Sequence, residues 1–239
     1  MAGNVTFFES VLRFNDGLAH ERPALPEGFD IVNPLTGEQR ERVECVTRAF
    51  YQRYYNDTRP RRLILGSSPA RRGSAVTGVP FEDAQQLQRE TGIRLDAFHV
   101  QPSSSDFLAE VMRRYGGRER FYSDFYMNFV CPLGIVKTNA KGRAVNCNYY
   151  EDKKLAEALL PLIVRTIQGQ IALGIDTSVC YCIGSGENYR FLSQLNADHR
   201  FFGAVIALEH PRFITQYHAT QRDAFIEKYL KALCGPSGR

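Results

Sequence analysis

The sequence lacks several features that would assign it to a simple class. No apolar run reaches the roughly 18 residues that a membrane helix needs, so a membrane-spanning protein is not expected. The N-terminus has no basic segment followed by an unbroken apolar stretch, so it differs from a secretory signal and indicates the cytoplasm. The six cysteines include no Cys-x-x-Cys pair and lack the spacing of zinc or iron–sulfur sites. We therefore expect buried, reduced thiols.

The chain also has little excess of either charge. Thirty Lys and Arg against 26 Asp and Glu give a net charge of +4, which by itself does not indicate nucleic-acid binding. The arginines are nevertheless clustered. One group is Arg59, Arg61, Arg62, Arg71 and Arg72, and the other is Arg113, Arg114, Arg118 and Arg120. Such clusters are usually solvated faces, but beside strand ends they would suggest phosphate contacts.

What is present is the composition of a globular protein, with 239 residues, 44% apolar and 23% charged. No linker, repeat or low-complexity segment divides the chain, so one domain over residues 1–239 is expected. Two helices at residues 6–14 and 38–55, joined by a loop, predict a helical N-terminal extension over residues 1–58 that packs on the rest.

Beyond residue 58 short apolar runs alternate with helical patterns. The expected strands are residues 62–66, 125–130, 178–184 and 203–209, and the expected helices are 81–91, 105–115, 155–173, 188–195 and 221–233. This alternation predicts an α/β fold with a central, mostly parallel four-stranded sheet flanked by helices. Each strand is followed by glycine, proline or polar residues. Because ligands bind outside the carboxyl ends of parallel strands, we expect a site at that edge.

Two kinds of site can be read from these segments. Residues 66–70 resemble a relaxed nucleophile elbow, with Ser68, His210 and either Asp176 or Asp198 as a triad, which would make a serine hydrolase. Pro69 argues against it, because the residue after the nucleophile must supply an N–H to the oxyanion hole. Ser185 and Gly186, ahead of a helix, offer N–H groups to a phosphate, or Ser185 simply caps the helix.

Four segments together resemble the uracil-DNA glycosylase superfamily. They read Leu-Gly-Ser-Ser-Pro-Ala at residues 65–70, Thr-Gly-Val-Pro-Phe at 77–81, Asn-Phe-Val-Cys-Pro-Leu at 128–133 and His-Pro-Arg at 210–212. The order and spacing are similar to the single-strand-selective monofunctional group, in its bacterial SMUG-like branch. The resemblance spans about residues 60–235 and implies an enzyme that flips uracil from DNA and hydrolyses its N-glycosidic bond.

The resemblance also implies roles for single residues in a uracil pocket. Phe81 would stack on the pyrimidine. Asn128 would read uracil, because one carboxamide can accept from N3–H and donate to O4, whereas cytosine has the opposite polarity. Ser67, Pro69 and Ala70 would line the pocket, with Ala70 near the 5-position of the base.

Catalysis and DNA contacts follow from the same resemblance. His210 would donate a hydrogen bond to O2 of the departing uracil, and Arg212 would act as a wedge or phosphate contact, with Arg71, Arg72, Ser185 and Gly186 also facing DNA. The sequence departs from the family at Ser68, where the residue that positions the attacking water is usually Asn or Asp. A hydroxyl is a weaker proton acceptor than a carboxylate. Either Ser68 only orients the attacking water and this is sufficient, or Ser67, Asp124 or another group takes over the positioning of the water.

The sequence thus predicts a monomeric, monofunctional uracil-DNA glycosylase of base excision repair that needs no metal or cofactor. Because of Ser68, the alternative is a protein that recognises uracil or abasic sites in DNA without cleaving the bond.

Overall fold

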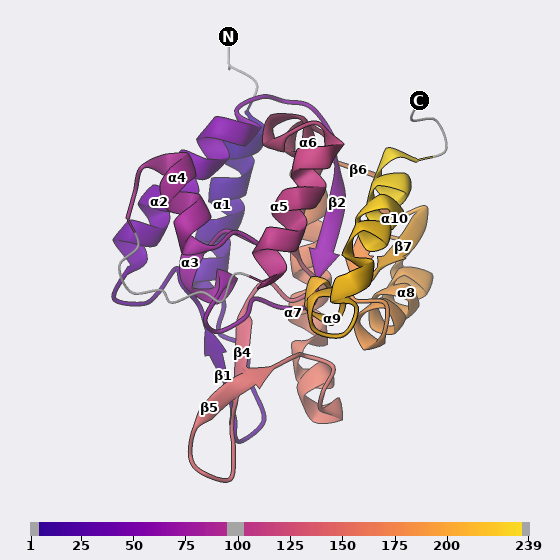
Figure 1. The fold of residues 1–239 in the computed structure, drawn as a ribbon. Helices are drawn as coiled ribbons and strands as arrows, with labels where there is room; N and C mark the ends of the chain where they lie inside the picture. Colours follow the sequence, from indigo (N-terminus) through magenta and orange to yellow (C-terminus); the bar gives the residue numbers. More distant parts are fainter. Residues whose placement is uncertain (1–4, 95–102, 236–239) are drawn as a thin grey trace.

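A central parallel sheet organises the protein. The computed structural model describes residues 5–94 and 103–235 (Figure 1). Strands β2 (Arg61–Gly66), β3 (Phe125–Phe129), β6 (Ile175–Ile183) and β7 (Ala204–Leu208) form a four-stranded sheet in the order β3-β2-β6-β7. All neighbouring pairs are parallel, and the core of apolar side chains surrounds this sheet. The predicted α/β fold is therefore confirmed, with strand boundaries close to those expected.

Helices lie on both sides of this sheet (Figure 1). They are α1 (Phe7–His20), α2 (Arg40–Tyr55), α3 (Ser74–Thr77), α4 (Ala84–Thr91), α5 (Ser103–Tyr115), α6 (Arg118–Asp124), α7 (Lys153–Ile171), α8 (Glu187–His199), α9 (Pro211–Tyr217) and α10 (Arg222–Cys234), with a short 3-10 turn η1 (Ala219–Gln221). Each long helix buries an apolar stripe, as its sequence periodicity predicts. No helix within the described ranges is long and apolar enough to cross a membrane.

A second, smaller sheet was not predicted from the sequence. Strands β1 (Phe29–Val32), β4 (Gly134–Thr138) and β5 (Ala144–Cys147) form an antiparallel sheet in the order β1-β4-β5. The segment before residue 58 is thus not purely helical, because it contains β1, which lies between α1 and α2 in the chain and pairs with β4. These strands are only four or five residues long, and β5 is mostly exposed, so they carry no clear apolar alternation. In Figure 1 this sheet extends below the central one.

Arg61 and Arg62, the first two residues of β2, make structural contacts, contrary to the phosphate-contact hypothesis. Arg61 is completely buried, and its guanidinium donates to Asp57 at 2.9 and 3.0 Å and to the carbonyl oxygen of Tyr122 at 2.7 Å. Arg62 donates to the carbonyl oxygen of Leu233 at 3.0 Å. Both residues begin a strand, so they lie at the edge of the sheet opposite the carboxyl ends.

The second arginine cluster is also engaged within the protein. Arg113 and Arg114 both form ion pairs with Glu110 at 2.7 Å, and the Arg120 guanidinium lies 5.4 Å from the centre of the Tyr115 ring. These arginines lie in α5 and α6, which precede β3. These arginines are therefore paired within the protein and lie away from the carboxyl edge of the sheet.

The cysteines are free thiols, as predicted, but not all are buried. Cys131, Cys147, Cys180 and Cys182 are buried, whereas Cys45 and Cys234 are exposed. The prediction of burial was wrong for the last two because each occupies the outer face of an amphipathic helix, α2 or α10.

Candidate active site

The loop after β2 and the end of β3 are held side by side. The backbone N–H of Val130 donates to the carbonyl oxygen of Gly66 at 2.8 Å, and that of Cys131 donates to Ser67 at 3.0 Å. Gly66 has no room for a side chain, because a Cβ atom there would lie 2.6 Å from Phe81 Cζ. The first and third motifs of the sequence analysis are therefore joined by backbone hydrogen bonds at the carboxyl edge of the sheet.

Phe81 is held in a backbone conformation that is unusual for a residue with a side chain. Its φ is 63°, a region that costs about 1–3 kcal/mol outside glycine. Its N–H donates to Ser74 Oγ at 3.0 Å, and its ring stacks on Phe129 with centroids 5.0 Å apart and planes at 24°. Phe81 remains partly exposed. The predicted stacking residue therefore has one ring face supported by Phe129.

The next residue anchors this strained position. The Glu82 carboxylate is buried, accepts from Arg118 Nη1 at 3.0 Å and also accepts a short hydrogen bond from the Tyr122 hydroxyl. Arg118 and Tyr122 thus hold Glu82 in place next to Phe81, and breaking a buried pair of this kind by removing one partner typically costs about 3–5 kcal/mol. Arg118, predicted as part of a solvated or phosphate-binding cluster, instead supports the loop.

Asn128 is the fourth residue of β3 and is 5% exposed. Its Nδ2 donates to Tyr126 Oη at 2.9 Å, and its Oδ1 accepts from the N–H of Phe129 at 2.9 Å. These contacts fix which way the carboxamide faces. A carboxamide has two donor hydrogens and two acceptor lone pairs, so one of each remains for a ligand. One donor beside one acceptor is the pattern complementary to O4 and N3–H of uracil.

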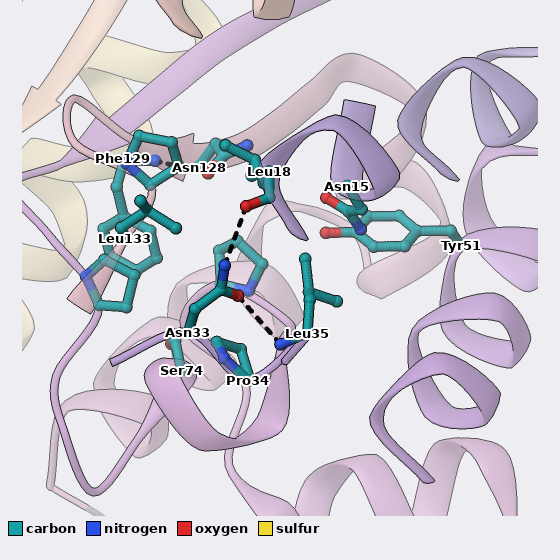
Figure 2. Close-up of a pocket in the computed structure, with 14 residues that line it drawn as sticks. Asn15, Leu18, Asn33, Pro34, Leu35, Tyr51, Ser74, Asn128, Phe129 and Leu133 are labelled. Carbon is teal, nitrogen blue, oxygen red and sulfur yellow. Dashed lines mark hydrogen bonds between the residues drawn. The ribbon is translucent and has the colours of Figure 1, made fainter. Parts of the chain in front are cut away.

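A pocket borders Asn128 on the side of the N-terminal helices (Figure 2). Asn15 of α1 and Tyr51 of α2 lie across the pocket from Asn128. In the wall of the pocket, Asn33 Nδ2 donates a hydrogen bond to the carbonyl oxygen of Leu18, and Asn33 Oδ1 accepts one from the N–H of Leu35. These N-terminal residues were not predicted to be part of the site. Their spacing in the sequence could not have shown it, since they reach the pocket only through the packing of α1 and α2.

His210 follows β7 and caps α9. Its Nδ1 accepts from the N–H of Arg212 at 3.1 Å, so in the neutral ring Nε2 carries the proton and is the available donor. The pKa of His210 is lowered to about 4, first by desolvation among the surrounding elements and then by the charge of Arg212. His210 is nevertheless an exposed residue. His210 is therefore a neutral hydrogen-bond donor at physiological pH.

We expect His210 to stay neutral across the range in which most histidines titrate. A group with a pKa of about 4 is almost fully deprotonated above pH 5.5, so its imidazole NMR shifts should remain constant between pH 5.5 and 7.5. The resonances can be assigned by their loss in His210→Ser. A titration midpoint near 6.5 for this ring would contradict the prediction.

Ser67 and Ser68 both contact Asn148, a residue that was not predicted to be part of the site. Both hydroxyls donate to Oδ1 of Asn148, Ser67 at 2.8 Å and Ser68 at 3.3 Å. Asn148 follows β5 in the small sheet, and Asn146 within β5 accepts from the N–H of Arg71 at 2.8 Å. A polar residue beside an exposed edge strand looks like ordinary surface, so no sequence signal pointed to it.

The residues predicted to face DNA lie at this same edge of the sheet. Arg72 and Arg212 are exposed, Arg71 is partly exposed, and none of the three has an ion-pair partner among residues 5–94 and 103–235. Ser185 and Gly186 are exposed after β6, and Gly186 rather than Ser185 is the N-cap of α8. Their contacts with DNA remain predictions.

The carboxylates proposed as alternatives lie away from these residues. Asp176 is the second residue of β6, and Asp124 precedes β3 and accepts from the Tyr115 hydroxyl at 2.7 Å, so both are at the opposite edge of the sheet. Asp198 lies near the end of α8 and accepts from Gln194 at 3.0 Å. His210 Nδ1 is an acceptor here and does not donate to a carboxylate. The serine hydrolase triad and the Asp124 hypothesis are therefore wrong.

Comparison with known proteins agrees with this arrangement. The model of the Uracil DNA glycosylase superfamily matches residues 52–234. The chain belongs to the uracil-DNA glycosylase superfamily. The crystal structure of wild-type SMUG2 from Pedobacter heparinus is similar, with 41% identity, a TM-score of 0.89, and coverage of 95% of this chain and 97% of that chain. No curated protein matches. The superfamily match begins within α2, whereas the similarity to SMUG2 includes most of the N-terminal segment as well.

Proposed function

We propose that this superfamily member is a monofunctional uracil-DNA glycosylase that acts in base excision repair as a monomer. The observation that carries the proposal is the carboxamide of Asn128, whose remaining donor and acceptor complement uracil. A cytosine in the same position would present a donor to the donor and an acceptor to the acceptor. Buried groups left unpaired by the wrong base give strong discrimination.

The hydrolysis separates charge, and the site is suited to this. As the bond between sugar C1′ and uracil N1 breaks, the electron pair stays on the base and negative charge develops at O2. The Nε2–H of neutral His210 would donate to that oxygen. Phe129 covers one face of the Phe81 ring, and the flipped uracil would stack on the other face. Backbone N–H groups at Ser67 and Ser68 would add further donors. Water then bonds to C1′ and leaves an abasic site.

The free energy of base flipping must be recovered by these contacts, since unstacking costs a few kcal/mol and least in a single strand. The exposed Arg72 and Arg212 and the partly exposed Arg71 would contact phosphates near the site, together with the exposed N–H groups at Ser185 and Gly186. These contacts would place the uracil above the carboxyl edge of the sheet, at which residues 67–70, Asn128 and His210 all lie.

We expect Asn128→Ala to lower the single-turnover rate of uracil release by at least roughly tenfold, because two hydrogen-bonding groups of the base lose their partner. The rate is measured on a single-stranded oligonucleotide with one uracil, followed by alkaline cleavage of the abasic site. Asn196→Ala is a matched control, since this asparagine also makes two hydrogen bonds, to Phe202, but lies in α8. Equal rates for both variants would contradict the role of Asn128.

The second candidate function is recognition of uracil or abasic sites without cleavage, and it is favoured by Ser68 in place of Asn or Asp. The same assay separates the two functions. Alkali-labile sites at uracil alone support the glycosylase, whereas binding of the uracil oligonucleotide without any cleavage supports the recognition protein.

A further inference from the structure

Asn148 brings a carboxamide oxygen to the two serine hydroxyls of the loop after β2. Its Oδ1 lies 3.3 Å from Ser68 Oγ and 2.8 Å from Ser67 Oγ. All three residues are only partly buried, so the group is open to water. Ser68 stands at the motif position usually taken by Asn or Asp, and the missing side-chain oxygen is present here on a different loop.

The orientation of the Asn148 carboxamide is set by Glu151. Its Nδ2 donates to Glu151 Oε1 at 3.0 Å, and its backbone N–H donates to the same oxygen at 2.8 Å. Lys137 Nζ lies 3.1 Å from Glu151 Oε2. Although partial burial alone would raise the pKa of Glu151, hydrogen bonds from Asn148 and Lys137 lower it overall, so the group is a carboxylate. A carboxylate only accepts, so Nδ2 must face it and Oδ1 must face the serines.

We propose that Asn148, oriented by Glu151, is the positioning residue for the attacking water and stands in for the motif residue that Ser68 replaces. This inference rests on the proposed glycosylase function. Because the Ser68 hydroxyl donates to Asn148 Oδ1, the lone pairs of Ser68 Oγ are free to accept from a water molecule. The water is then held with its own lone pair directed at C1′.

The hydrolysis of the N-glycosidic bond in this site needs no strong base. The bond between C1′ and N1 breaks and its electron pair leaves with uracil. The water oxygen bonds to C1′, and its proton passes to the surrounding solvent. Asn148 neither gains nor loses a proton, so its effect is on orientation, and orientation of a reactant alone contributes substantially to rate.

Asn146 offers a matched comparison within the same hairpin. It also joins the small sheet to the loop after β2, but its Oδ1 accepts from the backbone N–H of Arg71, and within the described residues it makes no hydrogen bond to either serine hydroxyl. If the hairpin served only to brace the loop, the two asparagines would be equivalent. The inference requires that only Asn148 affects the chemical step.

The experiment measures single-turnover uracil release with enzyme in excess over DNA, for wild type, Asn148→Ala and Asn146→Ala. We expect Asn148→Ala to lower the rate about tenfold or more, with the Kd for uracil DNA within about twofold of wild type, and Asn146→Ala to change the rate by less than about threefold. Melting temperatures confirm that the variants are folded. Equal rates for wild type and Asn148→Ala, or equal losses in the two variants, would overturn the inference.

Two further variants test the role by rescue and by pH. Ser68→Asn restores the carboxamide at the motif position and should raise the rate of Asn148→Ala severalfold, whereas a purely structural role predicts no recovery. Asn148→Asp places a titratable group beside Glu151 and should add an ionisation to the pH profile that wild type lacks. Absence of both effects would overturn the inference. A wild-type protein that releases no uracil would instead overturn the proposed function, and the inference with it.

Discussion

Replacement of His210 by alanine is expected to lower the single-turnover rate of uracil release by roughly 100- to 1000-fold, the loss seen when one oriented donor to a developing oxyanion is removed. The donor is Nε2–H, because Nδ1 is occupied by the N–H of Arg212. The lowered pKa of about 4 means that the wild-type ring donates as a neutral imidazole at pH 7. The measurement is quantification of alkali-labile sites over time with enzyme in excess.

His210 also caps α9, so the alanine variant removes two functions together. His210→Ser separates them, since serine is a good N-cap but has no imidazole N–H to reach the base. We expect the serine variant to recover any lost melting temperature while its rate stays as low as that of the alanine variant. A rate close to wild type in His210→Ser would show that only the cap matters.

Arg61→Met is expected to lower the free energy of unfolding by about 3–5 kcal/mol, because it leaves the buried carbonyl oxygen of Tyr122 without its donor and removes two charged hydrogen bonds from Asp57. The guanidinium is completely buried, donates to Asp57 and to Tyr122, and lies 4.7 Å from the centre of the Tyr55 ring. Methionine retains much of the apolar side-chain volume, so the change mainly removes polar contacts. Urea unfolding followed by circular dichroism measures the effect.

Arg59→Ala is the control for this prediction. Arg59 pairs with the same carboxylate at 2.7 Å, but its side chain is 62% exposed, and exposed pairs contribute about 0–1 kcal/mol.

Burial alone would raise the pKa of Asp57, but hydrogen bonds from Arg61 and Arg59 lower it to about 2. This lowered pKa adds stability above the unfolded pKa near 4, and the contribution is lost as pH falls toward 2. The loss of unfolding free energy caused by Arg61→Met should therefore be smaller in acid. A loss of similar size in Arg59→Ala would contradict the structural role assigned to Arg61.

The central sheet was predictable because each of its strands is a buried apolar run, and a buried parallel strand is recognisable without its neighbours. The carboxyl-end residues Ser68, Asn128 and His210 were predictable for the same reason, since parallel strands bring their ends to one edge. The small sheet was not, because strands such as β5 show no alternation and are stabilised only by pairing with β4. The buried role of Arg61 was also hidden, because an arginine beside a strand reads as surface until its partners are known.

By itself the sequence determined the α/β class, the edge of the sheet at which the motifs lie and the family to which they are similar, because these depend on local pattern and chain order. Tertiary structure alone decided the partners of each polar group. It placed Asn148 against Ser68 across 80 residues of chain, closed the pocket beside Asn128 with α1 and α2, and fixed the donor nitrogen of His210. The physical reason is that hydrogen bonds and desolvation act at distances of a few ångströms, and only the folded chain brings those atoms together.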